Sequence, residues 1–196
     1  MIGFFRKLSL FILPVMALGL AACETPVSIQ KLPELTYGHL PPLKLNVAKI
    51  EVVAQYQSPL REPNVEHLFP TPPLKALRRW ASDRLRAVGR SGKARLFITD
   101  ASAIKTSLRK KTGVVATFTK QQSDRYDLTV DTVLEVSDGH RGGRVSARVT
   151  RFTTLREDIT LNERDRAWFD MTEALVKDFD AEIEKNIRQV LADWVR

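Results

Sequence analysis

The chain has 196 residues, carries a formal net charge of +8 and contains one cysteine, Cys23. This length is enough for one domain with a hydrophobic core and leaves little room for a second. A single cysteine excludes an intrachain disulfide, so packing alone must hold the fold together.

Residues 1–22 differ in composition from the rest of the chain. Arg6 and Lys7 form a basic start, and an apolar run over residues 8–20 follows. The run is too short for a comfortable membrane span, and small residues separate it from Cys23. This layout predicts a secretory signal peptide that is removed from the mature protein.

The four residues Leu20, Ala21, Ala22 and Cys23 resemble the lipobox of bacterial lipoproteins. The resemblance implies that the leader is cleaved before Cys23, whose thiol receives a diacylglycerol thioether and whose new amino terminus is acylated. Stable anchoring needs more than one acyl chain, because each buried methylene contributes only about 0.8 kcal/mol. The alternatives are an ordinary signal peptide that leaves a free thiol, and a cysteine buried in the core.

Removal of the leader takes away two of the 31 basic residues and none of the 23 acidic ones, which leaves a net charge of +6. A basic surface in the cell envelope favours anionic partners, namely phospholipid head groups, lipopolysaccharide phosphates or peptidoglycan carboxylates. The alternative is that the charge only keeps the domain soluble. Glu24 is not the aspartate that resembles an inner-membrane retention signal, so we expect the periplasmic face of the outer membrane rather than the inner membrane.

Residues 24–42 contain four prolines and show no sustained periodicity. We interpret residues 23–42 as the lipidated cysteine and a proline-containing tether, which extends about 60 Å at about 3.3 Å per residue. The remaining residues, 43–196, are expected to form a single α+β domain.

The first β-rich segment covers residues 43–56, and its hydrophobicity alternates with a change of parity near Ala48 and Lys49 that predicts a bulge. A proline-rich loop, residues 57–73, follows it. The length of this loop is typical of a functional or mobile segment.

A helix is expected from Thr71, which suits a cap before two prolines, to Gly89 or Gly92. One face of this helix is apolar, and the other carries one acid, Asp83, among basic residues. These basic residues are the candidate anion-binding site: Lys75, Arg78, Arg79, Arg86 and Arg90. A solvated face of good helix formers is the alternative.

Strand character recurs over residues 94–108, 113–119, 126–136 and 144–157. In the third of these segments apolar residues share one face and acids lie mostly on the other, while the fourth turns arginines outward. A glycine-rich turn joins these two segments. We therefore expect an antiparallel hairpin whose acidic and basic outer faces lie opposite each other.

Thr160 and Glu163 match a capping box, and apolar residues then recur every three or four positions as far as Trp194. A helix of about 30 residues is about 45 Å long, which exceeds the span of a small sheet. The helix is therefore expected to bend across the sheet or to project toward a partner. The predicted fold is α+β: an antiparallel sheet of about four strands, one helix after the first strand, and a long C-terminal helix packed on one face.

The sequence shows no catalytic constellation. His39, His67 and His140 fall on the tether, a loop and a turn, without the close spacing of metal ligands. Neither a nucleophile elbow nor a phosphate loop is present. We therefore expect a protein that is not an enzyme and that uses no metal, cofactor or nucleic acid. An envelope hydrolase assembled from distant residues is the least favoured alternative.

Behind the lipobox, the order of elements resembles the lipoproteins that serve lipopolysaccharide assembly and the auxiliary lipoproteins of lipid-transporting ABC systems. A tyrosine that opens an alternating strand after a polar turn, as in QQSDRYDLTV (residues 121–130), is part of this resemblance. The resemblance implies an accessory or assembly factor that binds an envelope protein complex handling lipid or lipopolysaccharide. A regulator of a peptidoglycan synthase, reached by the tether, is the alternative.

Overall fold

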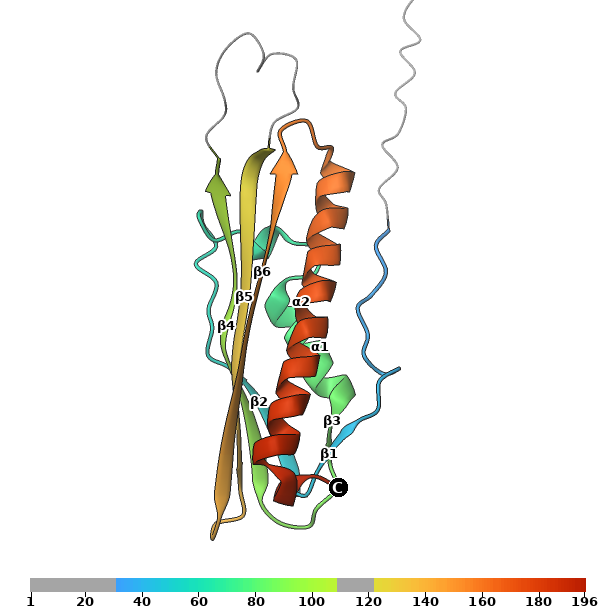
Figure 1. The fold of residues 1–196 in the computed structure, drawn as a ribbon, viewed down its shortest axis with the longest axis vertical. Coiled ribbons are helices and arrows are strands. Elements are labelled where there is room, and N and C mark those ends of the chain that lie inside the picture. The colour runs from blue at the N-terminus through green and yellow to red at the C-terminus, as the bar shows by residue number, and fades with distance from the viewer. Residues whose placement is uncertain (1–30, 109–121) are drawn as a thin grey trace, which may run out of the picture. The chain divides into compact units, whose positions relative to one another are not determined.

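A computed structural model describes residues 31–108 and 122–196, which belong to one compact unit. Its elements in chain order are β1 (Leu43–Leu45), β2 (Lys49–Ala54), α1 (Pro73–Arg84), β3 (Leu85–Ala87), β4 (Lys93–Ser107), β5 (Gln122–Ser137), β6 (Gly142–Arg156) and α2 (Leu161–Val190) (Figure 1). Two short 3-10 helices, Glu66–Leu68 and Ala192–Trp194, complete the list. The predicted α+β class is confirmed. The predicted leader, the lipobox and the strand over residues 113–119 lie outside the described residues.

Four strands form the main sheet in the order β2-β4-β5-β6. β2 runs parallel to β4, whereas β4, β5 and β6 are antiparallel neighbours, as the sequence pattern predicts for the last two. On the outer face, Asp131 of β5 accepts a hydrogen bond from Arg148 of β6 at 3.3 Å, which confirms the opposed acidic and basic faces. Both helices pack on the other, inner face of this sheet (Figure 1).

The single strand expected over residues 43–56 is two strands in two different sheets. β1 pairs in parallel with β3, whereas β2 joins the main sheet. The change of parity near Ala48 therefore marks the point where the chain leaves one ladder for another, and the predicted bulge there is wrong. A true register shift occurs in β4 between Ile98 and Asp100, which explains why that strand does not alternate cleanly.

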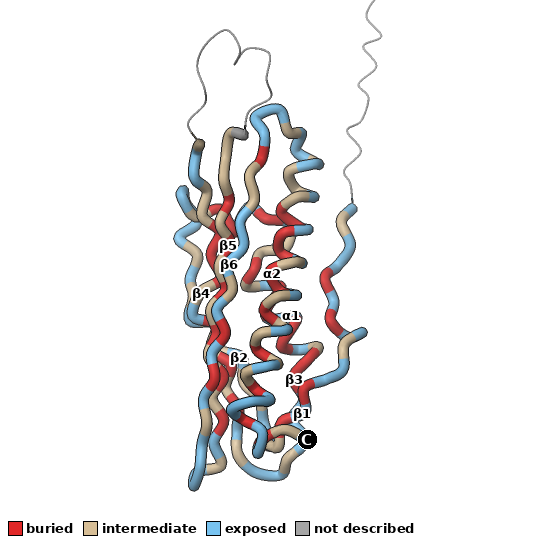
Figure 2. Tube along the Cα trace, in the orientation of Figure 1, coloured by how far each residue is buried: buried red, intermediate tan, exposed pale blue. Residues whose placement is uncertain are grey.

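Buried side chains line the inner face of the sheet and the facing stripe of α2 (Figure 2). On β5 the predicted inward residues are all buried: Tyr126, Leu128, Val130, Thr132, Leu134 and Val136. On α2 the predicted stripe is buried as far as Ile187, and only Val190 is exposed. The capping box is confirmed, because Thr160 accepts from the backbone of Glu163 and the Glu163 side chain accepts from the backbone of Thr160.

The length of α2 matches the sheet because the strands are long. β5 and β6 contain 16 and 15 residues, so at about 3.3 Å per residue they span about 50 Å. The 30 residues of α2 span about 45 Å. The helix therefore runs along the hairpin for its whole length, and it neither bends across the sheet nor projects beyond it, contrary to the expectation from its length (Figure 1).

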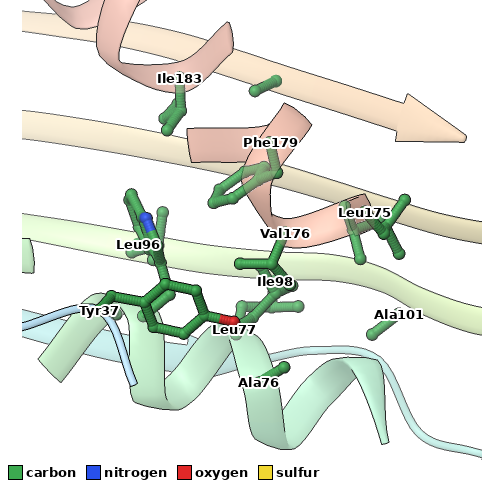
Figure 3. Close-up of a cluster of buried hydrophobic side chains, with 14 of the residues drawn as sticks. Tyr37, Ala76, Leu77, Leu96, Ile98, Ala101, Leu175, Val176, Phe179 and Ile183 are labelled. Carbon is green, nitrogen blue, oxygen red and sulfur yellow. The ribbon is translucent and has the colours of Figure 1, made fainter. Parts of the chain in front are cut away.

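Part of the predicted tether packs on the domain. Leu35 and Tyr37 are both 6% exposed and belong to the hydrophobic core, and the Tyr37 backbone N–H donates to Asp83 Oδ2 at 2.9 Å. Figure 3 shows the Tyr37 ring among apolar side chains of α1, α2 and β4. The packed part of the chain thus begins before residue 43, and residues 24–30 lie outside the described residues.

A buried arginine joins the two helices. Arg84, the last residue of α1, is 1% exposed and donates to Asp180 at 2.7 Å and to Glu184 at 2.5 Å, both on α2. Trp80 Nε1 also donates to Asp180 at 2.7 Å. Burial alone would raise the pKa of Glu184, but hydrogen bonds from Arg188 and Arg84 outweigh it and hold that pKa below its usual range. The Glu184 carboxylate is therefore ionised when the chain is folded near neutral pH.

Replacing Arg84 with Leu should lower the free energy of unfolding by about 3 kcal/mol, because it leaves the carboxylates of Asp180 and Glu184 without their buried cation. Urea denaturation measures the loss. Arg188→Leu is the matched control, since Arg188 pairs with the same Glu184 at 2.7 Å from an exposed position and should cost no more than about 0.5 kcal/mol. Equal losses in the two variants would contradict the assigned role of Arg84.

The Tyr37 hydroxyl is buried without a hydrogen-bond partner among the described residues. Burial, with a further contribution from Glu173, raises its pKa, so it stays protonated and its proton lacks an acceptor. Tyr37→Phe should therefore raise the free energy of unfolding by about 1 kcal/mol. Tyr56→Phe should lower it by a similar amount, because the Tyr56 hydroxyl donates to buried Glu66 at 2.5 Å. Chemical denaturation of both variants checks the opposite signs.

Candidate functional site

The predicted basic face of one helix is only partly present. Lys75, Arg78 and Arg79 are exposed on α1, at positions that share one face of a helix. The helix ends at Arg84, and Leu85 turns to extended backbone with φ −88° and ψ 130°. The expectation that the helix continues to Gly89 or Gly92, with Thr71 as its cap, is wrong: Pro72 is the N-cap residue, and no side chain caps this end.

Arg86 and Arg90 therefore do not lie on α1. Arg86 is in β3, and Arg90 is in the connection between β3 and β4. The helix stops because the residues after Arg84 pair in parallel with β1, and a backbone that joins a ladder cannot continue the helical hydrogen bonds. Sequence periodicity did not predict this pairing, because the apolar residues Leu85 and Val88 also fit helical spacing.

Arg86 nevertheless stays beside the basic face of α1. Its guanidinium donates to the backbone oxygens of Ser82 at 2.5 Å and Leu85 at 3.0 Å, at the C-terminal end of α1. A cation at this end interacts favourably with the helix dipole. Lys44 of β1 is the register partner of Arg86 and is also exposed, so the two side chains lie on the same face of the small sheet.

We call this surface the basic stripe, and it consists of Lys44, Lys75, Arg78, Arg79 and Arg86. Sequence reasoning missed Lys44, because its neighbour Arg86 lies more than 40 residues away and only the pairing of β1 with β3 brings them together. The available signal was that Lys44 stands between two apolar residues of a strand and must therefore point away from the core.

Few acids balance this stripe. Arg79 donates to Asp83 at 2.9 Å, and the same Asp83 oxygen accepts from the backbone of Tyr37. Glu34 lines a pocket of about 330 Å³ together with Lys75, Arg78 and Arg79. No ion pair involves the other four cations of the stripe within the described ranges. Exposed lysines and arginines of this kind bind phosphates and carboxylates, and they do so with strong salt dependence.

A larger groove lies between the packed N-terminal segment and α2. It has a volume of about 860 Å³ and is lined by residues 33–40, except Gly38, and by one face of α2 that includes Glu173, Ala174 and Lys177. Tyr37 and Phe169 contribute aromatic surface to it. Among the described residues, no hydrogen bond or ion pair joins two of the side chains that line it.

The loop after β2 is held by a buried carboxylate. Glu66 is 3% exposed and accepts from the Tyr56 hydroxyl and, at 3.2 Å, from the backbone N–H of Ala103 on β4. Burial alone would raise the pKa of Glu66, but hydrogen bonds from Ser58 and Tyr56 outweigh it and lower that pKa. The proline-rich loop is thus fixed to the sheet, and Glu66 has its acceptors occupied by structural partners.

The three histidines lie on three separate segments: His39 at the groove, His67 in a short helix and His140 in the β5–β6 turn. No group of three potential metal ligands occurs among the residues that the structure describes. Over the same residues, no helix has the length and apolar character needed to span a membrane.

No protein-family model and no curated protein matches this chain. Among solved structures, the chain is similar to the rare lipoprotein B from Shewanella oneidensis, with 11% identity, a TM-score of 0.34, and coverage of 70% of this chain and 92% of that one. It is also similar to a minor lipoprotein from Acinetobacter baumannii, with 11% identity, a TM-score of 0.38, and coverage of 74% and 96%. At these identities and scores the two likenesses support no inference about the function of this chain.

Proposed function

We propose that this chain is a non-enzymatic lipoprotein of the bacterial cell envelope, anchored through Cys23, that acts as an accessory or assembly factor for a complex handling lipid or lipopolysaccharide. The observation that carries the proposal is the lipobox-like stretch Leu20 to Cys23 behind a basic, apolar leader. We favour attachment to the periplasmic face of the outer membrane, because Glu24 follows the cysteine.

The packed N-terminal segment limits how far the domain stands from its anchor. Leu32 already packs against the core, so only the residues from Cys23 to Leu32 separate the anchor from the domain. At about 3.3 Å per residue this stretch reaches at most about 30 Å. The domain thus works close to its membrane, which favours a lipid-handling role over the long reach that a regulator of a peptidoglycan synthase requires.

The basic stripe supplies the second part of the proposal. A domain held near a membrane by an acylated cysteine meets anionic head groups at high local concentration, and each basic residue near such a surface contributes about 1 kcal/mol. We propose that the stripe binds anionic lipid or lipopolysaccharide phosphates and orients the domain on its membrane.

Replacing Cys23 with Ser should prevent lipidation, because a hydroxyl does not form the thioether. In a bacterium that lipidates its envelope proteins, the wild-type chain should lose residues 1–22, gain the mass of its acyl groups and fractionate with membranes. The Cys23→Ser variant should show none of these changes, and Thr25→Ser should behave like the wild type. Mass spectrometry and fractionation check the outcome. A Cys23→Ser variant that fractionates with membranes at the mass of the processed, acylated wild type would refute the anchor.

The basic stripe is tested without the lipid, on residues 23–196 with Cys23→Ser. Combined replacement of Lys44, Lys75, Arg78 and Arg86 by Gln should weaken binding to phosphatidylglycerol vesicles at least tenfold at low salt, since each cation contributes about 1 kcal/mol near an anionic surface. Vesicle sedimentation measures the binding, and phosphatidylcholine vesicles give the background.

The control for this experiment removes the same charge elsewhere on the surface. Its four substitutions are Lys49→Gln, Lys93→Gln, Lys177→Gln and Lys185→Gln, all at exposed positions. This control should retain most of the binding. An equal loss in both variants would mean that net charge, and not the stripe, drives the association.

A further inference from the structure

Among the described residues, β6 is an edge strand whose outer side is open. There it is the last strand of the main sheet and pairs only with β5. Within the described part of the chain, one hydrogen bond reaches its outward backbone groups: Asn186 Nδ2 of α2 donates to the backbone oxygen of Ser146 at 2.8 Å. That contact also shows that the Ser146 carbonyl points away from the β5 ladder.

Alternate residues of β6 share the direction of Ser146. The register with β5 is continuous from Gly142 to Leu155, and in a regular strand every second residue directs its N–H and C=O to the same side. Arg144, Arg148, Thr150 and Phe152 therefore present unpaired backbone donors and acceptors along the free edge. Their side chains lie on the outer face of the sheet, away from α2, and all four are exposed.

The described residues cover the other long edge of the sheet but not this one. Where β4 extends beyond β2, the loop before α1 pairs with it: the Val65 backbone N–H donates to Ala103 at 2.9 Å, and the Lys105 N–H donates to Pro63 at 2.8 Å. Exposed edges are commonly blocked by proline, bulges, short length or a covering segment. β6 has 15 residues and no proline, and its register is unbroken over the free stretch.

The positive charge of β6 favours pairing with an acidic strand. Residues 142–156 contain four arginines, Arg144, Arg148, Arg151 and Arg156, and no acid. Each forms an ion pair within the chain, yet the side chains of Arg144 and Arg148 remain 68% and 66% exposed. Pairing of β6 with β6 of a second copy would bring like charges together, whereas an acidic strand would complement them.

We propose that the free edge of β6 binds an extended acidic segment of a partner protein by strand addition. Backbone groups of the segment pair with those of Arg144, Arg148, Thr150 and Phe152. Acidic side chains at alternate positions lie over Arg144 and Arg148, and an apolar side chain contacts Phe152, which is 62% exposed. This inference depends neither on the lipid anchor nor on the basic stripe.

The probe is an acetylated, amidated peptide of about nine residues that alternates Glu with Thr and Val, and its measurement is backbone amide exchange by NMR. In the free protein the amides of Arg148, Thr150 and Phe152 should exchange rapidly, while those of Val149 and Arg151 are protected by the ladder. A saturating concentration of peptide should slow the exchange of the Arg148, Thr150 and Phe152 amides at least tenfold. A peptide of the same composition with a central proline should not.

Two substitutions at one position distinguish backbone pairing at the β6 edge from electrostatic attraction of the acidic peptide to the protein surface. Thr150→Ala and Thr150→Pro both remove the contact of the Thr150 hydroxyl with Thr129 at 3.1 Å, but only proline removes the outward N–H, and edge strands tolerate it there. The affinity of Thr150→Ala for the peptide should lie within about twofold of that of the wild type. The affinity of Thr150→Pro should be at least tenfold lower. Arg148→Glu should also lower the affinity for the peptide at least tenfold, and this variant serves as the test if Thr150→Pro fails to fold.

Three results would overturn the proposal. The peptide could leave the three amides unprotected, or Thr150→Pro could bind it as well as Thr150→Ala does. The third is that the three amides are already protected in the free chain and light scattering gives the mass of a dimer, which would assign the edge to a second copy.

Discussion

The packing of α2 against the β5–β6 hairpin is the contact on which the rest of the structure depends. One apolar stripe of the helix, buried from Trp168 to Ile187, covers the inner face of the sheet. Arg84 then attaches α1 to the same helix through two carboxylates. Both helices lie on the inner face, so no described element covers the outer face of the sheet or pairs with the edge of β6.

The same attachment decides where the basic stripe lies. α1 ends at buried Arg84, and the chain leaves the helix to pair with β1. This turn brings Arg86 beside Lys44 and keeps both on the surface with the exposed face of α1. A surface that could bind phosphates therefore arises from the end of a helix, and not from a continuous helical face.

Periodicity predicted much of this fold because long amphipathic elements carry strong signals. The inward residues of β5, the charges opposed across β5 and β6, and the capping box of α2 all follow from local patterns. Local patterns gave wrong predictions where two different backbone structures fit the same spacing of apolar residues. Leu85 and Val88 fit a helix as well as a strand, and the parity change near Ala48 fits a bulge as well as a change of sheet.

The sequence by itself determined the fold class, the long hairpin and the extent of α2, because alternation and helical spacing depend only on which residues are apolar. It also determined the lipobox-like leader, which is a contiguous motif. Only the tertiary structure decided that Leu35 and Tyr37 enter the core, that Lys44 joins the basic stripe, and that the described residues cover the edge of β4 but leave that of β6 open. These features depend on contacts between residues far apart in the chain, and no local pattern encodes which distant partner a strand or an apolar segment will meet.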